Sequence, residues 1–158
     1  MYHRRVKPLL VDAAAAAFER LGVRATIDDV AREAGVSRAT VYRHVRDRDE
    51  LVLAVFGREA DRLLERMRAA GAHSIADGVV FAVHAVPSQP FLLEVMRNPP
   101  AGAWQLCVDR ARASMGDRLD PDEVEWVLRA VLSLLLLPSD RSDDDLRAFV
   151  DRFLGVRA

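Results

Sequence analysis

A group of small and polar residues between Thr26 and Arg48 has the types and spacing that suit contact with DNA. An arginine carries a planar fork of donors that matches O6 and N7 of guanine, a pairing worth roughly 1–3 kcal/mol of discrimination between bases. Arg43 is placed for this role, with the hydroxyl group of Thr40 close by. The other polar members suit phosphate oxygens, which position a protein on DNA without reading its sequence. The predicted DNA-binding set is Thr26, Ser37, Arg38, Ala39, Thr40, Tyr42, Arg43, His44, Arg46 and Arg48.

Two short helices joined by a tight turn are needed to present this group. Thr26, with Asp29 three positions later, gives the first helix a start that is similar to a capping box. Gly35 follows the last apolar residue of that helix, at the position where a left-handed conformation commonly ends a helix. The apolar residues of this first helix repeat at helical spacing and are Ile27, Val30, Ala31 and Ala34.

The second helix is predicted from Ser37, a suitable N-cap, to Val45. Val41 and Val45 share one side of it, while Ala39 and Arg43 fall on the opposite side. A helix-turn-helix of this kind places its second helix in the major groove of DNA. Any one of the polar side chains could be an ordinary solvated residue, and it is their combination on this element that indicates DNA binding.

From about Arg4 to Phe56 the chain resembles the DNA-binding domain of the tetracycline-repressor (TetR) family of bacterial transcription regulators. Val45 departs from the family, which more often has an aromatic residue there, but the position faces inward and needs only an apolar side chain. The resemblance rests on these runs, in this order: Leu10-Val-Asp-Ala-Ala14, Phe18-Glu-Arg-Leu-Gly22, Ala25-Thr-Ile-Asp-Asp-Val-Ala31, Ala34-Gly-Val-Ser37, Thr40-Val-Tyr-Arg-His-Val45 and Arg48-Asp-Glu-Leu51.

The resemblance implies a DNA-binding domain over residues 1–48 and a ligand-sensing and dimerisation domain over residues 49–158. It also implies a regulator, usually a repressor, that binds a palindromic operator as a homodimer. The helix that starts near Arg48 would join the two domains, and its movement is the expected route from ligand to DNA. The second domain is shorter than usual for the family, with a longer connection expected to be missing around residues 98–103.

An apolar stripe ahead of the helix-turn-helix predicts a helix that packs across the other two and ends at Gly22. Its packing would leave Arg4, Arg5 and Lys7 beside the DNA phosphates. The stripe consists of Val6, Leu9, Leu10, Ala13, Ala14, Ala17, Phe18 and Leu21.

Charge is distributed unevenly along a chain whose net charge is only −1. The first 48 residues contain ten Lys or Arg and six Asp or Glu, whereas the remainder contains thirteen and eighteen. A basic N-terminal part attached to a more acidic body favours DNA binding at one end, through the phosphate interactions that contribute much of the affinity. An imbalance of this size also arises by chance, so it supports the motif without establishing it.

The rest of the chain shows helical patterns separated by glycine and proline, and no alternating strand-like runs. Together with the N-terminal part, it predicts an all-α protein of one to two small domains. The helical patterns cover roughly Arg58–Ala70, Ser74–Val86, Pro90–Arg97, Ala101–Met115, Pro121–Leu137 and Asp143–Leu154.

The last two helical patterns are the candidates for a dimer interface. Two such helices from each of two chains would form a four-helix bundle, and a two-fold dimer would read two half-sites. The alternative is that these helices close the core of a single chain. The residues predicted for the interface are Val124, Val127, Leu128, Val131, Leu132, Leu135, Phe149 and Phe153.

A site for a small apolar ligand is predicted from the large or chemically distinct side chains of the second domain. The alternative for each of them is an ordinary core position. No cofactor is expected, and no spacing of residues suits a metal ion. The candidate ligand-binding residues are Phe81, His84, Phe91, Met96, Trp104, Cys107 and Trp126.

An enzymatic role is not expected, because the chain has no glycine-rich phosphate loop, nucleophile elbow or cluster of His and Cys. The single cysteine excludes an intramolecular disulfide, and neither a secretory signal nor a membrane span is recognisable, so a cytoplasmic location is expected. The second hypothesis for function is a helix-turn-helix protein that organises DNA or docks a protein partner without sensing a ligand.

Overall fold

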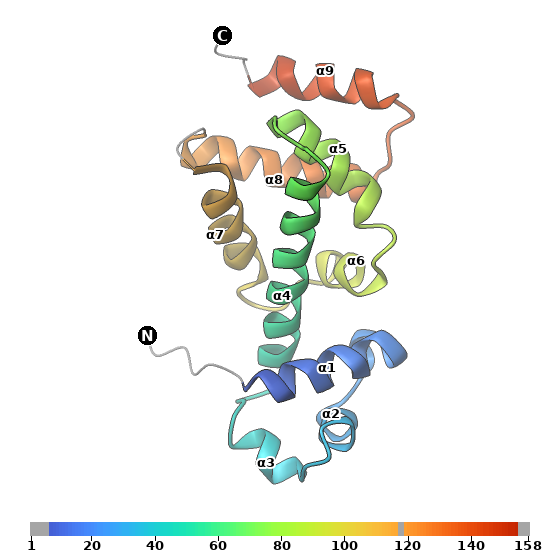
Figure 1. Cartoon of the computed structure of the whole chain (residues 1–158), viewed down its shortest axis with the longest axis vertical. Coiled ribbons are helices and arrows are strands. Elements are labelled where there is room, and N and C mark those ends of the chain that lie inside the picture. Colours follow the sequence, from blue (N-terminus) through green and yellow to red (C-terminus); the bar gives the residue numbers. More distant parts are fainter. Residues whose placement is uncertain (1–6, 117–118, 155–158) are drawn as a thin grey trace. The chain divides into compact units, whose positions relative to one another are not determined.

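A computed structural model describes residues 7–116 and 119–154, and within these ranges the chain is helical without any strand (Figure 1). The predicted all-α fold class is therefore confirmed. The elements are α1 (Pro8–Leu21), η1 (Gly22–Arg24), α2 (Ile27–Glu33), α3 (Arg38–Tyr42), α4 (Arg48–Ala69), α5 (Ile75–Ala85), α6 (Pro90–Arg97), α7 (Ala103–Met115), α8 (Pro121–Leu136) and α9 (Asp143–Leu154), with η1 a single 3₁₀ turn.

Two of these helices differ in extent from the prediction. The helix expected from Ser37 to Val45 is only the five-residue α3, because the chain tightens after Tyr42 and His44 N–H donates to the Val41 carbonyl at 2.8 Å. Such a bond to the third preceding residue belongs to a 3₁₀-type turn. The pattern expected from Arg58 onward continues the helix that begins at Arg48, so α4 is one helix of 22 residues.

The chain divides into two compact units. The first contains the described part of Met1–Glu59 together with Pro90–Trp104, and the second contains Ala60–Gln89 with the described part of Gln105–Ala158. α6 therefore belongs to the first unit, although it follows α5 along the chain. The expected domain boundary after residue 48 coincides with the start of α4, whereas the two units divide inside α4. The assignment of functions to residues 1–48 and 49–158 stays a prediction.

The core of the first unit is built from α1, α2, α3, the beginning of α4, and α6. Phe18 of α1 is buried and stacks on Phe91 of α6, with ring centroids 5.3 Å apart. The Val23 N–H of η1 donates to the Glu94 carboxylate of α6 at 3.4 Å. Burial of apolar surface holds these elements together. The largest fully buried side chains of this unit are Val30, Val41, Val45, Leu51, Val55, Phe56, Leu92 and Val95.

The core of the second unit centres on α5, which contacts both α8 and α9. α5 and α8 each begin with a full capping box, in which Ser74 pairs with Asp77 and Asp120 pairs with Glu123. The buried residues of this core are Ala76, Val79, Val80, Val127, Leu146 and Val150.

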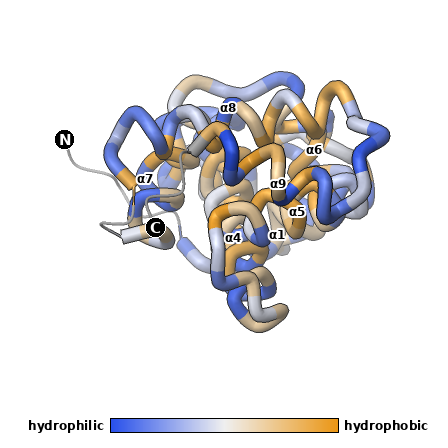
Figure 2. The backbone as a smooth tube through the Cα atoms, turned by 90° about the horizontal axis from the view of Figure 1, so that it is seen from above, coloured by the Kyte–Doolittle hydropathy of each residue, from blue (hydrophilic) through white to orange (hydrophobic). Residues whose placement is uncertain are grey.

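Hydrophobic and hydrophilic residues alternate along the helices in Figure 2, as expected for helices that bury one face. Among the described residues, no single helix is both long and apolar enough to cross a membrane, and only the bent pair of α5 and α6 passes jointly on length and composition.

Candidate nucleic-acid interface

The turn between α2 and α3 is fixed by hydrogen bonds that the local sequence predicts. Thr26 and Asp29 form a complete capping box at the start of α2, as expected. Hydrogen bonds from Thr26, first from its backbone N–H, and then from Arg32 lower the pKa of Asp29 to about 2. After α2, Gly35 adopts φ 64° and Val36 N–H donates to the Ala31 carbonyl at 3.0 Å, which is the pattern of a Schellman motif. The chain is thereby turned toward α3.

α3 separates an inward face from an outward face. Ser37 caps it, accepting a hydrogen bond from the Thr40 N–H at 3.2 Å. Val41 and Val45 are buried, as their spacing predicts. On the other side Arg38, Ala39, Tyr42 and Arg43 are exposed, while Thr40 and His44 are half-buried. The structure therefore brings the predicted reading residues together on one exposed surface.

Two exposed arginines of this surface differ in their surroundings. Arg38 donates to the Asp28 carboxylate at 3.3 Å and to the Tyr42 hydroxyl at 3.4 Å, and its guanidinium lies 5.4 Å from the Tyr42 ring centre. The bond to Tyr42, followed by the charge of Asp28, raises the pKa of Arg38. Arg43 has no pairing partner among the described residues, so its donors are available to a ligand outside the chain.

Arg46 and Arg48, both expected to hold phosphates, occupy contrasting positions at the start of α4. The Arg46 side chain is 85 % exposed and lies 3.5 Å from the Glu50 carboxylate. The Arg48 side chain is only 35 % exposed. Its Nε donates to the Ala25 carbonyl at 2.8 Å, and its guanidinium lies 5.9 Å from the centre of the Phe18 ring. Arg48 is thus engaged inside the first unit.

The remaining predicted phosphate contacts are exposed residues, although two of them already serve the fold. The Thr26 hydroxyl donates to Asp29 at 2.7 Å, and the Ser37 hydroxyl shares a hydrogen bond with Thr40 at 2.9 Å. Lys7 is exposed, whereas Arg4 and Arg5 lie outside the described residues.

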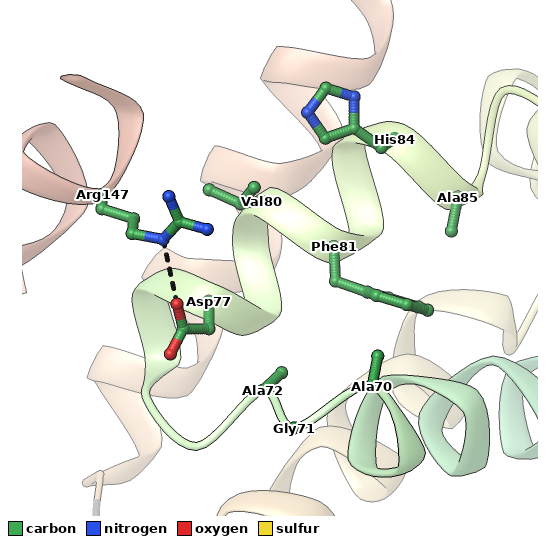
Figure 3. A pocket seen from close by; sticks show the side chains of 9 residues that line it. All are labelled: Ala70, Gly71, Ala72, Asp77, Val80, Phe81, His84, Ala85 and Arg147. Carbon is green, nitrogen blue, oxygen red and sulfur yellow. Dashed lines mark hydrogen bonds and ion pairs between the residues drawn. The ribbon is translucent and has the colours of Figure 1, made fainter. Parts of the chain in front are cut away.

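Two of the predicted ligand-binding residues, Phe81 and His84, line a cavity of about 490 Å³ in the second unit (Figure 3). Arg147 of α9 reaches the same cavity and donates through Nε to Asp77 at 3.0 Å. Hydrogen bonds from Ser74 and then from Arg147 lower the pKa of Asp77. The Phe81 ring and the small side chains around it form the apolar part of the wall. The lining residues are Ala70, Gly71, Ala72, Asp77, Val80, Phe81, His84, Ala85 and Arg147.

The other predicted ligand-binding residues do not line this cavity. Phe91, Met96 and Trp104 belong to the first unit, where Phe91 is occupied by its stack on Phe18. Cys107 is half-buried, and burial raises the pKa of its thiol to about 11. Trp126 stacks with Phe153, with ring centroids 6.2 Å apart. The sequence did not suggest Asp77 or Arg147, because the first is an ordinary helix-capping residue and the second lies 70 positions away.

The predicted dimerisation residues fall into three groups by exposure. Val124, Val127 and Leu135 are buried within the second unit. Burial of these three residues agrees with the alternative in which the last two helices close the core of a single chain. Leu128, Val131, Leu132 and Phe149 are half-buried. Phe153 is 60 % exposed, and the other exposed large apolar side chains among the described residues of the second unit are Leu136 and Leu137, which were not in the predicted set.

Comparison with known proteins places the helix-turn-helix in a defined context. Residues 10–55 match the family model described as bacterial regulatory proteins, tetR family. Two uncharacterised HTH-type transcriptional regulators of Mycobacterium tuberculosis, MT1294 and Rv1255c, are each 29 % identical to the chain over 151 residues. These alignments cover 81 % of this chain and 72 % of each relative.

Solved structures share the fold at low sequence identity. The TetR family repressor AlkX from Dietzia sp. strain DQ12-45-1b, implicated in biodegradation of n-alkanes, is 16 % identical with a TM-score of 0.62, covering 92 % of this chain and 91 % of that one. The fatty acid degradation regulator FadR from Bacillus halodurans is 15 % identical with a TM-score of 0.52, covering 94 % and 95 %. At these identities the likeness supports the fold alone.

Proposed function

We propose that the chain is a regulator of the TetR family, on the basis of the tetR family match over residues 10–55. We propose further that it is a repressor that binds a palindromic operator as a homodimer and releases it when a small ligand binds. In this proposal residues 1–48 bind DNA, and residues 49–158 sense the ligand and form the dimer. The regulator acts in the cytoplasm, where its DNA is.

The exposed surface of α3 carries the proposal. Arg43 faces outward without a side-chain partner among the described residues, and the small Ala39 beside it allows close approach to the groove. A guanidinium with free donors can bind guanine O6 and N7. Arg46 lies near the same end of the unit and suits a phosphate, which adds affinity but no sequence preference.

A two-fold dimer is supported by the shortness of α3 and by exposed apolar surface in the second unit. A recognition helix of five residues reaches few base pairs, so a second copy is needed to specify a site. Leu137 is 75 % exposed and Phe153 is 60 % exposed, which suits contact with another chain better than contact with water.

A ligand is supported by the cavity beside α5. Its volume of about 490 Å³ falls within the range of small-molecule sites, roughly 300–1,000 Å³. The Phe81 ring offers an apolar face, and His84 and Arg147 offer polar atoms for orientation. The His84 side chain is 64 % exposed, however, and such an open wall also suits the second hypothesis, a DNA-binding protein that senses no ligand.

The proposed operator binding is tested by selecting fragments of the source genome with the purified full chain and then footprinting the selected fragments. We expect one or a few sequences with two-fold symmetry, and Arg43→Ala should abolish their enrichment. Arg112→Ala is the matched control, because Arg112 is an exposed arginine of α7 in the second unit. Selection that yields only asymmetric or unrelated fragments would refute the palindromic operator.

The ligand arm is tested by thermal-shift screening of metabolites against the wild-type chain and Phe81→Ala. We expect a compound that raises the melting temperature of the wild type, has less effect on Phe81→Ala, and reduces binding to the selected DNA. A screen without such a compound, alongside intact operator binding, would favour the ligand-independent alternative.

A further inference from the structure

We propose that Arg48 is a positioning residue for the helix-turn-helix and does not hold a DNA phosphate. It would fix the first turn of α4 to the segment that leads into α2, so that α3 is presented to the groove in one orientation. The inference concerns the same DNA-binding surface as the proposed function. One of its two measurements, the ratio of affinities for operator and random DNA, rests on the proposed operator binding. It concerns the orientation of the reading helix, whereas Arg43 would make the contact.

The hydrogen bond from Arg48 to Ala25 joins two segments that are 23 positions apart. Ala25 is buried, and its carbonyl is the last one before Thr26, the N-cap of α2. A buried carbonyl requires a donor. Arg48 supplies this donor from the first residue of α4, so the start of α4 and the start of α2 are held at a fixed separation.

The Phe18 ring gives Arg48 a second attachment. Phe18 is buried in α1, lies 5.9 Å from the Arg48 guanidinium carbon and stacks on Phe91 of α6. A guanidinium over an aromatic ring is attracted by the ring electrons. The Arg48 side chain therefore connects α4 with α1 as well as with α2, and the stack with Phe91 keeps the ring in place.

The surroundings of Arg48 are also unfavourable for a phosphate. Its Nε is used by Ala25, and its Nη1 lies 3.6 Å from the carboxylate of Asp49. The negative charge of Asp49 would repel an approaching phosphate. Arg46, two residues earlier, also lies near a carboxylate, that of Glu50 at 3.5 Å, but its side chain is 85 % exposed and donates no hydrogen bond to a backbone carbonyl of the described residues. It is therefore the better candidate for a phosphate contact and provides a matched control.

Salt dependence separates the two roles. Each phosphate neutralised by a side chain contributes about 0.9 to the slope of log Kobs against log salt concentration. We would measure this slope for the full-length wild type, Arg48→Gln and Arg46→Gln on a random-sequence duplex. The temperature must be one at which circular dichroism shows all three proteins folded. The ratio of affinities for the selected operator and the random duplex is measured at the same time.

For Arg48→Gln we expect an unchanged slope and a specificity ratio that falls about tenfold, equivalent to roughly 1.4 kcal/mol. For Arg46→Gln we expect a slope smaller by about 0.9 per bound chain. A comparable fall in slope for Arg48→Gln would mean that Arg48 holds a phosphate, and would overturn the inference. An unchanged ratio together with a lower melting temperature would make Arg48 merely structural, and would overturn it as well.

A second variant covers the case in which Arg48→Gln fails to fold. Arg48→Lys keeps the positive charge but lacks the planar fork, so it would preserve a phosphate contact but not the combined contact with Ala25 and Phe18. For Arg48→Lys we expect an unchanged salt-dependence slope and a specificity ratio that is about threefold lower. An unchanged specificity ratio would overturn the inference. A wild-type chain without any preferred sequence would defeat the proposed operator binding, while the slope on random DNA would still decide whether Arg48 holds a phosphate.

Discussion

Replacing Gly35 with alanine should destabilise the fold by an amount that follows from backbone conformation alone. Gly35 ends α2 with φ 64°, and an added Cβ would meet no atom within 4 Å. The left-handed conformation costs a residue with a side chain roughly 1–2 kcal/mol. Alanine recovers about 0.4–1 kcal/mol because it restricts the unfolded chain. The expected net loss is therefore about 0.5–1 kcal/mol.

Three matched variants isolate this cause in urea unfolding followed by circular dichroism. Gly116→Ala should lose a similar amount, since Gly116 has φ 59° and equally open surroundings. Gly35→Asn should be nearly neutral, because asparagine tolerates the left-handed region. Gly78→Ala should raise stability, because Gly78 lies inside α5 and its Cβ would meet only the flexible end of the Met67 side chain, with the sulfur at 3.3 Å.

The same variants connect the turn with DNA binding. Gly35→Ala strains the residue that precedes α3 by three positions, so we expect about fivefold weaker operator binding, roughly 1 kcal/mol, with little change for Gly116→Ala. Gly35→Ala with wild-type stability would refute the conformational argument. Equal losses of operator affinity at Gly35 and Gly116 would refute the link between this turn and the orientation of α3.

Two further predictions concern the second unit. Burial raises the pKa of Cys107 from 9.0 to about 11, so the folded thiol stays protonated where an unfolded thiol ionises. The free energy of unfolding is therefore unaffected by ionisation of this thiol below pH 9 and decreases as the pH rises toward 11. Alkylation of the folded chain by iodoacetamide at pH 8 should be slow, and rapid alkylation would contradict the raised pKa. Leu137→Asp should shift the mass measured by light scattering from dimer to monomer, because Leu137 is 75 % exposed. Leu9→Asp, at a 57 % exposed leucine of the first unit, should leave the mass unchanged. A dimer that survives Leu137→Asp would place the interface elsewhere.

The local parts of the site were predictable because each depends on residues within one turn of a helix. The capping box of Thr26 and Asp29, the glycine after α2, and the inward direction of Val41 follow from spacing alone. The length of α3 was overestimated, since periodicity does not distinguish a helix from a tight turn that keeps Val45 buried.

The parts that could not be predicted depend on which distant segments meet. Arg48 looks like one more basic residue beside Arg46, and only the fold shows that the Ala25 carbonyl lies within its reach. Likewise, the cavity contains Asp77 and Arg147 because α5 packs on α9, which no local pattern reports. Hydrophobic periodicity indicates which face of a helix is buried, but it carries no information about the element that covers it.

The assignment of α6 to the first unit changes the expected route between ligand and DNA. Movement of α4 would be the only route from ligand to DNA if α4 were the only chain segment that joins the two units. The chain, however, passes from one unit to the other three times: after Glu59, before Pro90 and after Trp104. The intervening segment is firmly attached to the DNA-binding part, through the Phe91 stack on Phe18 and the Glu94 carboxylate on η1. In the proposed ligand response, the chain connections before Pro90 and after Trp104 would therefore be candidate routes in addition to α4. Since η1 leads directly into Ala25 and Arg48 donates a hydrogen bond to that residue from α4, the proposed routes would meet at the Ala25 carbonyl.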